Sequence, residues 1–399
     1  MMLRNRTFIL TWVLLSLLRI SPAWSQEAPF AVPAGLEGAV EFWRQIFSSY
    51  GMGDVVLFDP ADPAKIYSVL RLPDNDQGRA LVAKERARIA AEYQLADDES
   101  RIRSQRGAKE SFAAGLKMSG RYMAQMLKIF RDEGLPAELA YLPLVESSFN
   151  VRARSGVGAL GMWQFMPETG KKFMRIDAAV DERRDPMAST RGAARLLKQN
   201  YQILGSWPLA LTAYNHGTEG MFRGIKAVGS RDLVELIRNY ESPSFGFASK
   251  NFYAEFLAVV EIATHSENYF PFLRPHPAQQ LREVAVKAPT ALHALLKPAA
   301  ISQNEFFQWN PSLDAGTKVL PSGYSVRLPA DKVEPFITAQ NRALEPPPVK
   351  KNLPVKFPTK SPPAKLRGAS AKPNVIPVKA KPIAKRPASK SQQLKLASR

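Results

Sequence analysis

The stretch LAYLPLVESSF, residues 139–149, decides how the rest of this 399-residue chain is interpreted. It is apolar up to Val145 and then presents Glu146, the only carboxylate between Leu139 and Pro167. A lone carboxyl among apolar neighbours is disfavoured as an anion, so we expect its pKa to rise. A raised pKa suits a general acid that works near neutral pH, which makes Glu146 the leading candidate for a catalytic residue.

The residues around this stretch show helical periodicity over 111–272. Apolar residues recur at helical spacing in 122–130, Gly134 can end that helix, and Pro136 can open the next one towards Glu146. Pro143 predicts a kink in this second helix. Further helices are expected from an N-cap at Ser189, from Pro208 and over 251–264, and no alternating run of strand length interrupts them. The sequence therefore predicts a mainly α protein with a helical domain at 111–272.

Two smaller regions flank the helical domain. Residues 26–110 are expected to form an N-terminal helical region, with helices over 40–50 and 78–96 and a turn at 59–63. Residues 281–330 contain two alternating runs separated by two short helical patterns, which predicts a compact β-α-α-β unit.

The two ends of the chain have compositions of their own. Residues 1–25 have a basic start, a short apolar run and a small-x-small site at 23–25, which predicts a signal peptide cut before Gln26; an uncleaved anchor is the alternative. Of the formal charge of +19, 14 charges lie in residues 346–399, which have no acidic residue, so the rest of the chain carries only about +5. This Pro/Lys-rich segment predicts a disordered tail.

Composition also limits the chemistry. The chain has no cysteine, which excludes disulfides, a thiol nucleophile and thiolate metal sites. The four histidines show no ligand spacing, so we expect no metal and no cofactor. An exported chain whose basic tail has almost no aromatics is a poor nucleic-acid partner; the tail is either a solvated tether or a segment that adheres to anionic envelope surfaces.

Glycoside cleavage is one reaction that needs a general acid. It usually employs two carboxylates, and this region offers one strong candidate, Glu146. The nearby segment DERRDP, residues 181–186, interleaves its acids with arginines and is therefore interpreted as a self-paired structural turn. One carboxylate can still suffice. It protonates the glycosidic oxygen and then, as a base, helps an internal hydroxyl of the sugar to attack the anomeric carbon.

Four ordered motifs carry a family resemblance over residues 111–264. They are ESSF at 146–149, SGVGALGMWQFMPETG at 155–170, DERRDP at 181–186 and AYNHG at 213–217. Together they resemble the lytic murein transglycosylases of the Slt and goose-lysozyme-like superfamily, in particular the membrane-bound lytic murein transglycosylase D type. The resemblance implies a lysozyme-like helical domain around a cleft.

The resemblance also assigns roles to single residues. Glu146 matches the catalytic acid/base, and Ser155 matches a polar residue that orients the reacting sugar. The remaining substrate-binding positions that it implies are Gly161, Met162, Trp163 and Gln164, of which the backbone and the Gln164 side chain line the groove, and Tyr214 and Asn215 beside the acid. One segment departs from the family pattern: Ala248 and Phe252 stand where an acid and a tyrosine are common, and Tyr253 is displaced by one residue.

Other interpretations of these residues stay open at this stage. Glu146 could be a solvated residue on a helix face, and Tyr214 could be a core tyrosine with a satisfied hydroxyl. Trp163 could be a core residue or an exposed platform for a sugar ring. His216 is interpreted as an exposed variant of a small residue.

The implied function is cleavage of peptidoglycan glycan strands in the periplasm or cell envelope. A lytic transglycosylase would break the bond between N-acetylmuramic acid and N-acetylglucosamine and leave a 1,6-anhydro end. A goose-type hydrolase and a non-catalytic wall-binding scaffold are the alternatives. The unit at 281–330 resembles a degenerate LysM module, a small sugar-binding fold; a purely structural appendix is the alternative.

Overall fold

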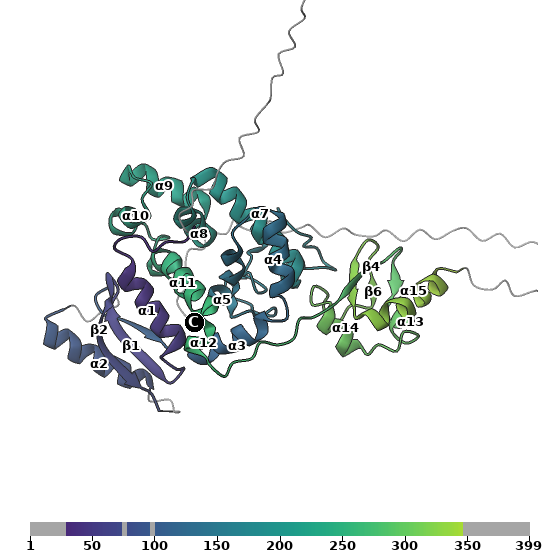
Figure 1. Ribbon diagram of the computed structural model, residues 1–399, viewed down its shortest axis with the longest axis horizontal. Helices are drawn as coiled ribbons and strands as arrows, with labels where there is room; N and C mark the ends of the chain where they lie inside the picture. Colours follow the sequence, from purple (N-terminus) through teal and green to yellow (C-terminus); the bar gives the residue numbers. More distant parts are fainter. Residues whose placement is uncertain (1–28, 74–77, 96–99, 346–399) are drawn as a thin grey trace, which may run out of the picture.

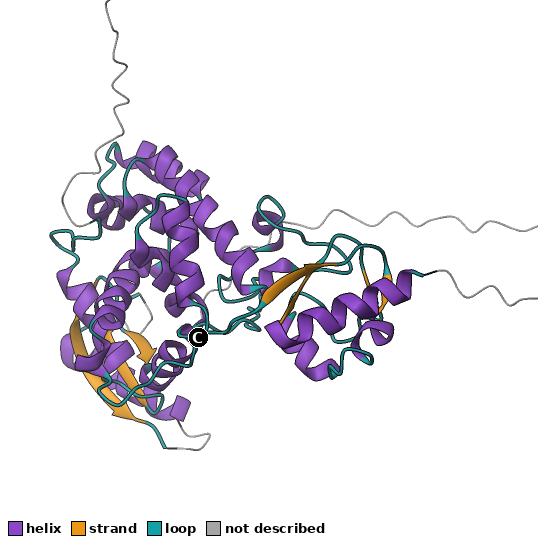
Figure 2. Cartoon of the chain, turned by 45° about the vertical axis from the view of Figure 1, so that its right-hand side comes forward, coloured by secondary structure: helices purple, strands orange, loops and turns teal. Residues whose placement is uncertain are grey.

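The structure is a computed structural model that describes residues 29–73, 78–95 and 100–345. Helices dominate it, and the strands gather near its two ends (Figures 1 and 2). A large apolar core runs through residues 36–262, and a separate one holds the C-terminal unit together. The expected signal peptide and basic tail lie outside the described residues. Among the helices that are described, none is long and apolar enough to cross a membrane.

The N-terminal region contains a sheet that the sequence did not predict. Helix α1 (Glu37–Ser48) and helix α2 (Gly78–Tyr93) are present, but strands β1 (Asp54–Asp59), β2 (Asp62–Arg71) and β3 (Arg103–Arg106) accompany them. They form an antiparallel sheet in the order β2-β1-β3. The expected turn at 59–63 is therefore the turn of a hairpin, and the expectation of a helical region was wrong on this point.

Burial explains why β1 escaped detection. Val56 and Phe58 pack into the large core, whereas Val55 and Leu57 pack on a small cluster with Ile89. A strand that is buried on both faces is a continuous apolar run without alternation, and such a run is too short to be assigned from periodicity.

Residues 109–269 are helical, and the described chain has only isolated β-bridges there. Helix α11 (Phe247–Thr264) is buried along most of its length and packs against α1, α8 and α5. The other helices are α3 (Lys109–Ser119), α4 (Met123–Asp132), η1 (Ala137–Tyr141), α5 (Leu142–Ser147), α6 (Pro167–Gly170), η2 (Glu182–Arg184), α7 (Pro186–Leu204), α8 (Trp207–His216), α9 (Thr218–Val228), α10 (Leu233–Asn239) and α12 (Ser266–Tyr269).

Most of the expected helix boundaries hold, with one correction. Gly134, at φ +69°, follows α4, and Pro143 lies in the first turn of α5, where the preceding 3-10 helix ends. Ser189 is not an N-cap, because the helix begins earlier: the carboxylate of Asp185 accepts hydrogen bonds from the backbone N–H groups of Met187 and Ala188. Asp185 precedes a proline, which is preorganised for the first helical position.

The C-terminal unit has the expected β-α-α-β order. Strand β4 (Arg282–Ala285) pairs antiparallel with β7 (Ser325–Leu328), and α13 (Leu292–Leu296) and α14 (Gln303–Trp309) lie between them in the chain. A second strand pair, β5 (Thr290–Ala291) with β6 (Val319–Leu320), and helix α15 (Ala330–Leu344) were not anticipated. Phe336 of α15 is fully buried in the core of the unit, so the folded unit extends past residue 330.

Candidate active site

Glu146 lies near the end of the short helix α5 and is partly buried. The chain turns sharply after it, because Ser148 and Phe149 both adopt left-handed backbone conformations, with φ of 51° and 58°. The N–H groups of both residues donate to the carbonyl of Pro143, and the ring of Phe149 is fully buried. Two consecutive non-glycine residues in this region are strained, so packing must hold them there.

Helix α3 approaches α5 closely at a glycine. A Cβ atom added to Gly115 would lie 3.0 Å from the side chain of Leu144 and 3.0 Å from the carbonyl oxygen of Ser148. The absence of a side chain at Gly115 thus helps to set the position of the helix that carries Glu146.

The loop of residues 153–165 lies against α5. Ser147 donates from its hydroxyl to the carbonyl of Met162 at 2.9 Å, which ties the residue next to Glu146 to this loop. Gly161 has φ of +78°, and a Cβ atom there would overlap the carbonyl oxygen of Arg183. Gln164 also has positive φ and donates from Nε2 to the carbonyl of Gly161 at 2.7 Å. The loop therefore has a defined shape beside Glu146.

Tyr214, on α8, is bonded to the same loop. Its hydroxyl donates to the carbonyl of Trp163 at 2.8 Å. Burial, and after it the negative charge of Glu146, hold the pKa of Tyr214 well above its ordinary value of 10. The phenol therefore stays protonated at neutral pH, and its electrostatic interaction with Glu146 shows that the two side chains are close in space although they are far apart in sequence.

Ser155 and Asn215 are both partly buried and hold local structure. The hydroxyl of Ser155 accepts from the N–H of Ala159 at 2.9 Å and closes the turn at 155–159. The side-chain oxygen of Asn215 accepts from the hydroxyl of Ser249 on α11 at 2.8 Å. Such bonds fix the orientation of both side chains before any ligand binds.

Burial decides between the two interpretations of Trp163 and leaves Met162 with a backbone role. The Trp163 ring is fully buried and donates from Nε1 to the hydroxyl of Thr190 at 2.9 Å, and Met162 is 1% exposed. A buried ring cannot serve as a platform for a sugar, so the core interpretation of Trp163 is the right one. These two residues contribute through their backbone carbonyls. The carbonyl of Met162 accepts a hydrogen bond from the hydroxyl of Ser147, and that of Trp163 accepts one from the hydroxyl of Tyr214.

The acidic turn at 181–185 is structural, as the sequence predicted, but it is not fully self-paired, because Arg184 pairs with Asp314 and Asp185 pairs with Arg327. Asp181 pairs with Arg183 at 2.8 Å, Glu182 accepts from the N–H of Arg175, and Asp185 caps α7. The buried guanidinium of Arg183 also donates to the carbonyls of Gly158 and Phe165, which anchors the middle and the end of the loop beside Glu146. The turn therefore supports the site without entering it.

Several supporting residues were missed at the sequence level. The hydroxyl of Ser147 orients the loop, that of Thr190 orients Trp163, and that of Ser249 orients Asn215. Only Ser147, as the neighbour of Glu146, carried a local signal; the others lie on separate helices, and their pairing depends on the fold. Within the described ranges, no group of three or more His, Asp or Glu side chains is placed to hold a metal ion.

His216 is partly buried, contrary to expectation. It packs edge-on against Phe245, and its Nδ1 lies 3.0 Å from the carbonyl oxygen of Ser244. Tyr253 is also buried, at 1% exposed, so it does not replace the tyrosine that the family pattern has one residue earlier.

Comparison with known proteins places this site in a class. Residues 127–236, which include Glu146 and Tyr214, match the family model of the transglycosylase SLT domain. Over these residues the chain is similar to the transglycosylase SLT domain, and the expected resemblance to this superfamily is confirmed.

The relatives indicate the type within that class. Membrane-bound lytic murein transglycosylase D of Escherichia coli (strain K12) is 28% identical over 199 residues, which are 49% of this chain and 43% of the relative. The chain thus spans less than half the length of this relative. A transglycosylase of the Enterobacteria phage PRD1 is 38% identical over 91 residues, 23% of this chain and 32% of the relative. The resemblance to the membrane-bound lytic murein transglycosylase D type is confirmed.

Among solved structures, the lytic transglycosylase Slt of Pseudomonas aeruginosa, an inactive mutant, matches 50% of this chain and 31% of its own. The sequence identity is 23% and the TM-score is 0.32.

Proposed function

We propose that the chain is a peptidoglycan lytic transglycosylase that cleaves the bond between N-acetylmuramic acid and N-acetylglucosamine and leaves 1,6-anhydro ends. One observation carries the proposal: inside an SLT domain, a partly buried Glu146 lies beside the protonated phenol of Tyr214. The downstream carboxylates at 181–185 are bound in structural roles. A mechanism that needs one carboxylate fits this arrangement.

In the proposed reaction, the Glu146 carboxyl gives its proton to the glycosidic oxygen while the bond from that oxygen to C1 of the muramyl sugar breaks. The 6-hydroxyl of the same sugar then forms the new bond to C1, and the Glu146 carboxylate takes the hydroxyl proton. Glu146 ends as it began, and no water is consumed. The nucleophile is already tethered to the reacting sugar, which removes the entropic cost of bringing in a second molecule. The raised pKa of Glu146 that the reaction needs stays a prediction.

The surrounding residues would hold the sugar. Ser155, Gln164, Tyr214 and Asn215 are partly buried polar residues of the site. The backbone of 161–164 would line the groove. The bonds that already orient these side chains favour binding, because little further ordering is needed.

The rest of the chain fits an enzyme of the cell envelope. The start of the sequence supports export, the β-α-α-β unit supports a LysM-like module, and the basic segment 346–399 supports adhesion to anionic envelope surfaces. Glycan strands of peptidoglycan are the proposed partner and substrate.

Replacing Glu146 by Gln tests the proposal. The amide keeps the shape of the side chain but cannot deliver and recover a proton, so clearing of purified sacculi should fall about 10²–10⁴-fold. Binding to sacculi, measured by co-sedimentation, should persist. Glu168→Gln is the matched control, because Glu168 is 85% exposed on the neighbouring helix α6 and pairs only with Lys171. Unchanged clearing by Glu146→Gln, or no clearing by the unaltered chain, would favour the non-catalytic scaffold.

A further inference from the structure

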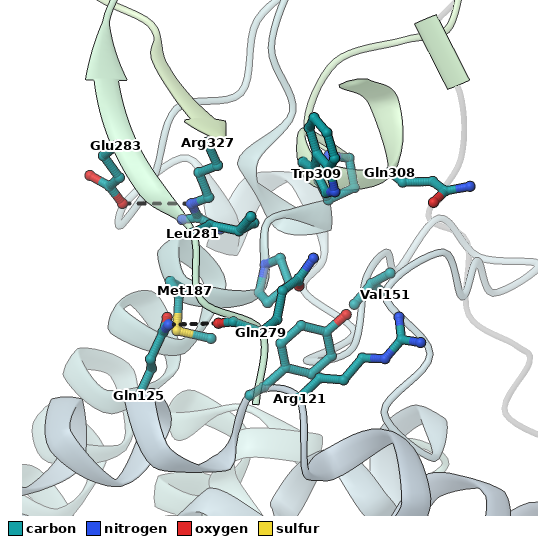
Figure 3. A pocket seen from close by; sticks show the side chains of 13 residues that line it. Arg121, Gln125, Val151, Met187, Gln279, Leu281, Glu283, Gln308, Trp309 and Arg327 are labelled. Carbon is teal, nitrogen blue, oxygen red and sulfur yellow. Dashed lines mark hydrogen bonds and ion pairs between the residues drawn. The ribbon is translucent and has the colours of Figure 1, made fainter. Parts of the chain in front are cut away.

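A pocket of about 60 Å³ lies at the junction between the helical domain and the C-terminal unit (Figure 3). Arg121 and Val151 line it from the helical domain, and Gln308 and Trp309 line it from α14. None of these residues has a part in the site around Glu146.

The two walls of this junction pocket are held together by buried and backbone contacts. Arg327 of β7 pairs with Asp185, the cap of α7, at 2.5 Å, and both side chains are about nine-tenths buried. Val180 of the helical domain bridges to Leu313 and packs into the core of the C-terminal unit. The C-terminal unit is therefore docked on the helical domain, so the pocket is a built feature of the fold.

The segment that joins the two parts is also fixed. The N–H of Gln279 donates to the carbonyl of Arg121 at 3.0 Å, and Gln125 donates from its side chain to the carbonyl of Gln279 at 3.2 Å. The joining segment, which contributes Gln279 to the lining of the pocket, is thus bonded to the helical domain.

The lining has the chemistry of a site for an acidic sugar. Trp309 is partly exposed at the end of α14, and Gln308 beside it is exposed and carries an amide. Arg121 is exposed on the opposite wall and makes no ion pair within the described residues. An indole face covers the apolar C–H surface of a pyranose ring, an amide hydrogen-bonds an N-acetyl group or hydroxyl, and a guanidinium binds a carboxylate.

The pocket lies close to Glu146 along a rigid path. Val151 follows Glu146 by five residues, and the turn between them is held by the buried ring of Phe149. Five residues span at most about 18 Å even when fully extended. Glu146 and the Val151 wall of the pocket are therefore separated by no more than the length of a few sugar units.

We propose that the junction pocket is a distal subsite for the glycan strand. Trp309 stacks on a pyranose ring, and Arg121 pairs with a carboxylate of the same strand, from either the muramyl lactyl group or a stem peptide. This inference rests on the proposed function, because it deepens the same substrate class. In this proposal the C-terminal unit and the helical domain each supply one wall of the binding site. The site therefore exists only while the C-terminal unit is docked on the helical domain.

Binding to defined strands tests the proposal. The full chain carrying Glu146→Gln, which should bind without cleaving, is titrated with long soluble glycan strands from sacculi. Adding Trp309→Ala should weaken this binding about tenfold, whereas Trp309→Phe should retain most of it. Phe272→Ala is the matched control, because Phe272 is 92% exposed on the joining segment and does not line the pocket. Unfolding curves of each variant verify that the docked fold is retained.

A second experiment tests the Arg121 wall of the pocket separately from the Trp309 wall. Arg121→Ala should weaken binding of muramyl strands but not of chitin oligosaccharides of similar length, which carry no carboxylate. Strands stripped of stem peptides assign the carboxylate: if the effect of Arg121→Ala persists, the lactyl group is the partner, and if it vanishes, the stem peptide is.

Two outcomes separate failure of this inference from failure of the proposed function. If the unaltered chain clears sacculi and Trp309→Ala binds long strands as tightly as Phe272→Ala does, the subsite is overturned and the proposed function stands. If the unaltered chain clears nothing and forms no anhydro product, the proposed function fails first.

Discussion

Two acidic segments of the same domain differ in what surrounds their carboxylates. Each acid at 181–185 is bound by an arginine or by backbone N–H groups, and the whole segment braces the loop and the cap of α7. Glu146 stands alone in sequence, on a short helix whose neighbours are apolar or hydroxyl-bearing, and its charge acts on Tyr214. The comparison teaches that clustered acids can serve the structure alone, and it leaves the solitary Glu146 as the carboxylate that we propose for catalysis.

The largest effect on stability is expected from the scaffold. Asp185→Ala removes the α7 cap and leaves Arg327 buried without its close partner, which should cost about 3–5 kcal/mol of unfolding free energy. Asp314→Ala, which breaks an exposed pair with Arg184 in the same junction, should cost less than about 1 kcal/mol. Urea unfolding of both variants checks the contrast; equal losses would show that Asp185 has no special structural role.

The next largest effect is expected at the contact between the acidic turn and the loop of residues 153–165. Gly161→Ala places a Cβ atom against the carbonyl oxygen of Arg183 at a positive φ, so it should destabilise the chain by about 3 kcal/mol and abolish clearing of sacculi. Gly156→Ala is the control, because it lies in the same loop with nothing within 4 Å of the added atom. Thermal unfolding and turbidity assays should separate the two variants. If Gly161→Ala behaves like its control, the loop is not locked as described.

A smaller effect is expected from the buried partner of Trp163. Thr190→Val removes the oxygen that receives the indole N–H, and leaving that donor unsatisfied should cost about 1–3 kcal/mol. Thr190→Ser keeps the oxygen and should cost less. Chemical unfolding of the two variants gives the comparison, and a Val variant as stable as the Ser variant would argue against a buried indole.

The smallest effect is a pH dependence from His216. Burial lowers its pKa below the ordinary 6.5, and its buried Nε2 has no hydrogen-bond partner among the residues that the structure describes. The unfolded chain therefore takes up the proton first, so this contribution to stability is complete above pH 6.5 and is lost as the pH falls below that value. His216→Leu should flatten the unfolding free energy between pH 7 and pH 5 relative to the unaltered chain. Parallel pH profiles would contradict this assignment.

How far the sequence predicted the molecule depended on whether a signal was local. The helical domain, the lone Glu146, the structural role of the acidic turn and the β-α-α-β order were all predicted from periodicity or short spacing. The sheet at 54–106 was missed because β1 is buried on both faces and shows no alternation. The start of α7 was misplaced because Asp185, already assigned to the acidic turn, is also the cap.

The site shows the same limit at the level of single side chains. The motif identified Trp163 as part of the site, but its burial depends on Thr190 and Tyr214, which come from other helices. The hydroxyl of Tyr214 is engaged with a carbonyl, which only the packing of α8 against the loop could reveal. Sequence reasoning therefore selected the residues, and the fold showed which of them are buried and which of them hold others in place.

The central claim is that one carboxylate suffices because the nucleophile is the substrate's own hydroxyl. Digestion of sacculi in ¹⁸O-labelled water, followed by mass spectrometry of the released muropeptides, tests it most directly. We expect unlabelled muramyl products, each one water lighter than the corresponding hydrolysis product. Reducing ends that carry the label would contradict the claim and identify the chain as a hydrolase of the same fold.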